Sequence, residues 1–107
     1  MHVGPDMVEA AYSFLLTTPP FRGWRLPPAD DVEFCIMRTN AFYADYIFIN
    51  GRHRIRISHT ICRTVSTLIV AVAHEMVHVK TGMAHGAKFK RAADTVCKQL
   101  GFDRGTF

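Results

Sequence analysis

The stretch AVAHEMVHVKTGMAHGAKF, residues 71–89, decides the fold around it, because it combines an apolar helical pattern, a glycine and three histidines. His74 and His78 are four residues apart, and residues with that spacing lie side by side on one face of an α-helix. Their ring nitrogens can therefore converge on a single metal ion, at about 2.1 Å from each nitrogen. The stretch thus predicts a helix that presents a pair of metal ligands.

Glu75 completes the pattern His-Glu-x-x-His. It lies about 100° around the helix from His74, too far for it to serve easily as a third ligand. Its carboxylate can still accept a proton from a water bound to the metal, because zinc lowers the pKa of such a water towards about 7. Chance produces the pattern in on the order of a few per thousand chains of this length. We therefore expect one zinc ion per chain, with Glu75 as the catalytic base.

Two histidines leave a tetrahedral zinc short of a protein ligand. No glutamate follows Glu75, and the later candidates are His85 and aspartates such as Asp94. In a continuous helix His85 would lie about 10.5 Å along the axis from His78, whereas two ligands of one zinc are at most about 4.2 Å apart. The chain must therefore fold back, and Gly82 is where the helix can end. We expect His85 to be the third ligand and Asp94 to face outward, towards solvent or a lysine.

The composition is that of one globular domain over residues 1–107, with 49% hydrophobic and 21% charged residues. The net charge of +4 permits a polyanionic partner without requiring one. Three widely spaced cysteines are typical of free thiols in a reducing compartment. The N-terminal residues show no signal sequence, and the longest aliphatic run is too short to span a bilayer. We expect a cytoplasmic protein with no membrane partner, and the sequence does not specify its oligomeric state.

Apolar periodicity predicts three helices and a small antiparallel sheet. The helices are expected from Asp6, over residues 60–81 and over residues 89–100. A strand is expected over residues 32–38, and Asn50-Gly51 between two β-rich runs predicts a hairpin with a type I′ turn. On the long helix one apolar stripe faces the core, roughly 150° around from the histidine pair. This stripe comprises Ile61, Val65, Leu68, Ile69, Val72, Met76 and Val79.

Side chains outside the histidine stretch leave several alternatives open. Ser58 or Thr60 can cap the start of the long helix. Tyr43, Tyr46 or an arginine can stabilise an oxyanion on the wall of a cleft. His53 is expected to be a core histidine with a hydrogen-bond partner.

Arg52, Arg54 and Arg56 alternate with apolar residues, so one face of their strand is basic. This face can bind a polyanion or a substrate, or it can simply discourage the sheet edge from aggregating. We refer to these three residues as the strand arginines.

The stretch HEMVHVKTGMAHGAKF, residues 74–89, resembles the SprT-like zinc metalloproteases, which combine HExxH with a later His-Gly-x-x-Phe or Trp. Residues 85–89, HGAKF, match the second element, and residues 55–58, IRIS, are similar to the strand that precedes the active-site helix in that family. The resemblance implies an α+β, zincin-like minimal metalloprotease domain, with three helices packed on a small antiparallel sheet. It implies a zinc endopeptidase that acts on protein or peptide substrates, DNA-associated proteins among them. The zinc ligands and the base are then the histidines and the glutamate already named.

Two other functions fit the same residues. A non-catalytic module can hold zinc for structure and bind nucleic acid or protein through the basic face. A zinc hydrolase can also cleave an amide bond that is not a peptide. A closed site with four protein ligands favours the structural role, and a site with an open position favours an enzyme.

Overall fold

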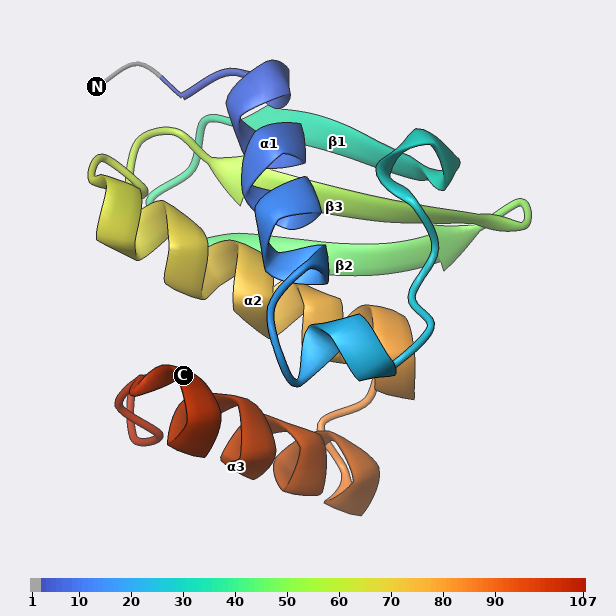
Figure 1. Ribbon diagram of the computed structural model, residues 1–107. Coiled ribbons are helices and arrows are strands. Elements are labelled where there is room, and N and C mark those ends of the chain that lie inside the picture. The colour runs from blue at the N-terminus through green and yellow to red at the C-terminus, as the bar shows by residue number, and fades with distance from the viewer. Residues whose placement is uncertain (1–2) are drawn as a thin grey trace.

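The computed structural model describes residues 3–107, which form one α+β unit (Figure 1). Helix α2 lies at its centre, with the sheet and α1 on one side and α3 on the other (Figure 1). The elements in chain order are α1 (Pro5–Leu16), η1 (Phe21–Gly23), η2 (Ala29–Asp31), β1 (Val32–Met37), β2 (Ala44–Ile49), β3 (Arg52–Ser58), α2 (Val65–Thr81) and α3 (Ala87–Leu100). The prediction of three helices on a small sheet is confirmed. None of these helices is long and apolar enough to cross a membrane within the described residues.

The sheet is mixed, so the prediction of an antiparallel sheet is wrong. Its strand order is β1-β3-β2, with β1 parallel and β2 antiparallel to β3. The hairpin at Asn50-Gly51 forms as expected, with φ angles of 53° and 75° at the two turn residues. The second strand of the hairpin, β3, pairs with β1 and therefore lies in the middle of the sheet, not at its outer edge. Alternation along a strand carries no information about this choice, because it specifies faces and not neighbours.

Helix α2 begins at Val65, five residues later than expected. Thr64 caps it, since the Thr64 side chain accepts a hydrogen bond from the Thr67 N–H at 3.1 Å. The predicted caps Ser58 and Thr60 lie before this point, and Val65 is 63% exposed instead of buried. Ile61 also lies before the helix, so it is not part of the stripe on α2. Ile69 and Val79 are half-buried against the core, and the fully buried members of the stripe are Leu68, Val72 and Met76.

The core lies between α1, α2 and one face of the sheet. Val32 of β1 and Ile55 and Ile57 of β3 are buried on this face, and Tyr12 and Leu15 of α1 cover them. The strand arginines point to the other face because side chains alternate along β3. The packing leaves β2 at the edge of the sheet, next to α2 (Figure 1).

Candidate metal centre

The structure brings His74, His78 and His85 together, as the sequence predicts. One ligand atom from each lies within 4.8 Å of the others, and the Nε2 atoms of His78 and His85 are 3.0 Å apart. The first two come from α2, and the third comes from the loop that leads into α3. Gly82 ends α2 with φ 99° and ψ −177°, a conformation that is essentially confined to glycine. This turn reverses the chain, so that His85 returns to the pair.

Both helical histidines are oriented by main-chain oxygens. The Nδ1 of His74 is 2.6 Å from the oxygen of Phe107, and the Nδ1 of His78 is 2.9 Å from the oxygen of Gly82. A carbonyl can only accept, so each Nδ1 carries the proton and each Nε2 keeps a free lone pair. Metal-binding histidines almost always donate their second N–H in this way. The two hydrogen bonds therefore prepare the Nε2 atoms as ligands.

Burial keeps these imidazoles neutral. It lowers the pKa of His74 to about 4, with a smaller effect from the nearby His78 and His85, and it lowers the pKa of His78 as well. Neutral imidazole is the form that binds a metal ion. The site therefore needs no deprotonation of these two residues at neutral pH before an ion can bind.

Phe89 forms a common wall for all three histidines. Its ring centroid is 5.1 Å from that of His74, 4.5 Å from that of His78 and 4.8 Å from that of His85. On another side, the Tyr46 ring lies parallel to the His78 ring at 6.1 Å. Such packing restricts the rotamers of the histidines. Phe89 thus belongs both to the apolar face of α3 and to the metal centre.

Glu75 is buried next to the cluster, with only 4% of its surface exposed. Burial, with a smaller contribution from the charge of Asp45, raises the pKa of the Glu75 carboxyl to about 8. A divalent cation beside it acts in the opposite direction and favours the carboxylate. Its place beside the histidines, facing a cavity, is the one that a general base requires.

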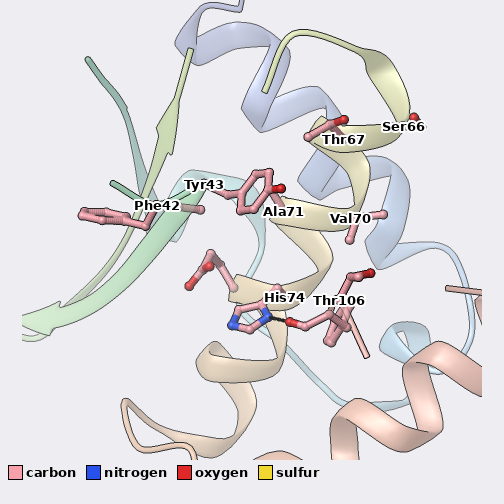
Figure 2. A pocket seen from close by; sticks show the side chains of 11 residues that line it. Phe42, Tyr43, Ser66, Thr67, Val70, Ala71, His74 and Thr106 are labelled. Carbon is pink, nitrogen blue, oxygen red and sulfur yellow. Dashed lines mark hydrogen bonds between the residues drawn. The ribbon is translucent and has the colours of Figure 1, made fainter. Parts of the chain in front are cut away.

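The cavity beside Glu75 has a volume of about 370 Å³ and runs along α2 (Figure 2). Its walls come from three parts of the chain: the start of β2 with the loop before it, one face of α2, and the segment that follows α3. The lining residues are Phe42, Tyr43, Ala44, Ser66, Thr67, Val70, Ala71, His74, Glu75, Thr106 and Phe107. His74 and Glu75 thus connect the metal centre to a cleft that a ligand can enter.

Strand β2 borders this cleft with a free edge. The Ser58 N–H donates to the Tyr43 carbonyl at 2.8 Å, and hydrogen-bonded pairs alternate from there along the antiparallel ladder. The N–H and C=O groups of Ala44, Tyr46 and Phe48 therefore point away from β3. An extended peptide can pair with these groups as an additional strand.

The donor set fits a zinc ion. Three imidazoles are ligands that zinc accepts in catalytic sites, where a tetrahedral ion holds its ligand atoms about 3.4 Å apart. The 3.0 Å between His78 and His85 is close to this spacing, and the exposed His85 has room to adjust its rotamer towards His74. Among residues 3–107, no fourth histidine, cysteine or carboxylate belongs to the group. A tetrahedral ion would therefore keep one position open.

The other predicted site residues lie apart from the cluster. Asp94 faces outward as expected, but its partner is Arg104, at 2.6 Å, and not a lysine. Arg54 pairs with Glu33, and Arg56 pairs with Asp45. The strand arginines therefore lie on the sheet face away from the histidines, and two of the three are engaged in ion pairs.

The two candidate tyrosines for the oxyanion, Tyr43 and Tyr46, differ in their surroundings. The Tyr46 hydroxyl is 2.6 Å from the Nδ1 of His53, so the expected partner of that histidine is found. Tyr43 is 56% exposed and lines the cavity together with Glu75. Only Tyr43 therefore combines an accessible side chain with a position on the cleft wall.

Sequence reasoning missed three contributions to the centre. The main-chain oxygens of Gly82 and Phe107 carry no sequence signal, because every residue has such an oxygen. Phe89 was detectable, since it lies four residues after His85 in the HGAKF element. The sequence places it at the start of the third helix, and the structure adds its contact with the three histidines.

No protein-family model, no curated protein and no solved structure matches the chain. The resemblance to the SprT-like metalloproteases therefore stays a prediction from residues 55–89. The metal centre and its cleft are the features of the molecule that bear on its function.

Proposed function

We propose that this protein is a zinc-dependent endopeptidase of the SprT-like type. One observation carries the proposal: His74, His78 and His85 converge next to the buried Glu75, on the wall of a cavity. Three imidazole ligands with an open fourth position favour a catalytic rather than a structural zinc. The order of the HExxH helix, the glycine turn and the HGAKF element supports the family assignment.

The chain supplies the parts that peptide hydrolysis needs. His74, His78 and His85 would hold the ion, which when bound supplies a Lewis acid that acidifies water and polarises a carbonyl group. Glu75 accepts the proton of the attacking water and later delivers it to the leaving amine. The main-chain oxygens of Gly82 and Phe107 keep two of the histidines aimed at the ion.

Substrate binding uses the edge of β2. A peptide that pairs with the free groups of Ala44, Tyr46 and Phe48 passes Ala44, the residue of this edge that lines the cavity together with Glu75. Tyr43 is the residue that we assign to the oxyanion, because the hydroxyl of Tyr46 is occupied by His53. Tyr43→Phe should therefore lower kcat while zinc content stays the same.

The replacement Glu75→Gln tests the proposal. It removes the proton acceptor and leaves the histidines in place, so the variant should retain about one zinc per chain and lose hydrolysis of a protein substrate such as casein. Glu33→Gln is the matched control, because Glu33 pairs with Arg54 on the far face of the sheet. A Glu75→Gln variant as active as the Glu33→Gln control would refute the assigned mechanism.

Nucleic-acid binding is a second candidate function, and a separate hollow favours it. Lys80, Lys88 and Arg91 line this hollow together with Trp24, and no carboxylate within residues 3–107 forms an ion pair with any of the three. We call these four residues the basic hollow. Cations can neutralise phosphates there, and an indole can stack on a base. Such binding would suit a protease that acts on DNA-associated proteins, and without catalysis it would suit a zinc-containing binding module.

A further inference from the structure

The cavity beside Glu75 has a chemical character of its own. Six of its lining residues are apolar or aromatic, and neither lysine nor arginine lines it. These six are Phe42, Tyr43, Ala44, Val70, Ala71 and Phe107. Its volume of about 370 Å³ lies near the lower end of the range of about 300–1,000 Å³ that is usual for ligand sites. The space is therefore large enough to hold one large apolar side chain.

Three of the four hydroxyl groups of the cavity already have partners, and the fourth, that of Tyr43, is the one assigned above to the oxyanion. Ser66 and Thr67 each approach the Thr64 Oγ1, at 3.3 Å and 2.8 Å, within the cap of α2. The Thr106 hydroxyl donates to the main-chain oxygen of Asp103 at 3.3 Å. A polar or charged side chain that enters the cavity would lose its hydration without gaining these groups as new partners. An apolar side chain incurs no such penalty.

The cavity has a defined direction relative to the reaction site. Its floor follows one face of α2 from Ser66 to His74, about 12 Å along the helix axis. The metal centre is at one end of this path, and the exposed Phe42 and Tyr43 extend its apolar wall towards solvent (Figure 2). A substrate side chain next to the bond that is cleaved can therefore enter the cavity while its main chain stays on the β2 edge.

We infer that this cleft selects substrates with a large apolar side chain, such as phenylalanine or leucine, adjacent to the cleaved bond, and that Ala71 sets the size of that side chain. The inference rests on the proposed peptidase function. Ala71 is 6% exposed and lies on the cavity floor, where a larger residue takes up the space of the substrate. A substrate that buries a large apolar side chain there should have a kcat/KM about 10- to 200-fold higher than a substrate with alanine at that position.

Peptide cleavage measures this preference. Cleavage sites in a peptide mixture are identified by mass spectrometry, and a matched set then varies one flanking position among Phe, Leu, Ala, Asp and Lys. The zinc-loaded parent should prefer Phe or Leu over Ala by at least about tenfold. Ala71→Leu should reduce cleavage of the Phe peptide and keep that of the Ala peptide, and Ala71→Val should fall between. A preference for Asp or Lys, or the absence of any preference, would overturn the inference.

Ala11→Leu is the matched control for this series. It adds the same atoms at a residue of α1 that is 7% exposed, close to the 6% of Ala71, and that lines neither the cavity nor the basic hollow. Its peptide preference should equal that of the parent, whereas the preference of Ala71→Leu should not. If both variants shifted the preference equally, a change in overall stability would be the cause and the role of Ala71 would be refuted.

A binding measurement separates this inference from the proposed function. N-acetylphenylalaninamide added to the Glu75→Gln variant should shift the backbone amide signals of Thr67, Val70 and Ala71 in ¹H–¹⁵N spectra, and N-acetylaspartamide should not. If the parent cleaves no peptide but these shifts appear, the peptidase function fails and the apolar cavity stands. If peptides are cleaved without these shifts and without preference, the cavity inference fails and the peptidase stands. If neither cleavage nor shifts appear, both fail.

Discussion

Replacing Gly82 tests the turn on which the metal centre depends. Gly82 has φ 99° and ψ −177°, and a Cβ added there would meet nothing within 4 Å. The cost of Gly82→Ala is therefore conformational rather than steric, at about 1–3 kcal/mol. In a domain of about 100 residues each kcal/mol lowers the Tm by about 4–8 °C. If the turn persists, the metal-free protein loses this stability.

If the turn relaxes instead, the loss appears in zinc affinity. The Gly82 oxygen would leave the Nδ1 of His78, and the path to His85 would change. Loss of such an orienting partner weakens a metal site by about 10–100-fold. Thermal unfolding of the metal-free protein and zinc titration against a competing chelator measure the two effects separately.

Two other glycines serve as controls. Gly101→Ala strains a left-handed residue at the end of α3, at φ 77°, so it should lower the Tm and leave zinc affinity unchanged. Gly86 has φ −79°, which alanine adopts readily, so Gly86→Ala should not destabilise the protein. A Gly82→Ala variant with unchanged Tm and unchanged zinc affinity would refute the reasoning, because the strain has to appear in one of the two.

Three further predictions concern the remaining parts of the molecule. His85→Ala should reduce zinc affinity by more than tenfold. Asp94→Ala should leave it unchanged, since Asp94 pairs with Arg104 away from the site. A zinc titration in which Asp94→Ala weakened binding more than His85→Ala would make the aspartate the third ligand. Thr64→Ala should cost about 0.5–2 kcal/mol of unfolding free energy by urea titration, and a larger loss for Thr60→Ala would contradict the observed cap. Replacing Lys80, Lys88 and Arg91 of the basic hollow by serine should weaken the binding of single-stranded DNA. The slope of log K against log salt concentration should become shallower by about two, because fewer counterions are released. Replacing all three strand arginines by serine should change this slope less. A larger change for the strand arginines than for the basic hollow would mean that nucleic acid binds to the sheet face instead.

Local sequence patterns were sufficient for the helical histidine pair. The i, i+4 spacing places His74 and His78 on one face of any α-helix, and glycine is the residue type that can end a helix with a positive φ angle, as Gly82 does. The hairpin at Asn50-Gly51 follows from the same kind of rule, because its φ angles are a property of the turn alone. These features depend on a few neighbouring residues, and so they can be read without the rest of the fold.

The sequence misassigned two features: the first depends on long-range pairing, and the second depends on which of several neighbouring hydroxyl residues caps the helix. The parallel pairing of β1 with β3 depends on where the hairpin inserts, and the start of α2 depends on Thr64 as its cap. The late start of α2 leaves Val65 exposed, although its spacing matches the apolar stripe.

The sequence by itself determined which residues can bind a metal, because side-chain chemistry and helical spacing are local properties. Only the tertiary structure decided what surrounds them. The Phe107 oxygen that orients His74 is 33 residues away in the chain, and the cavity beside Glu75 is closed by residues 42–44 and 106–107. Contacts between such distant segments form only when the core packs, and main-chain oxygens look alike in every sequence. The identity of the ligands is therefore local, and the orientation of the ligands and the shape of the cleft are global.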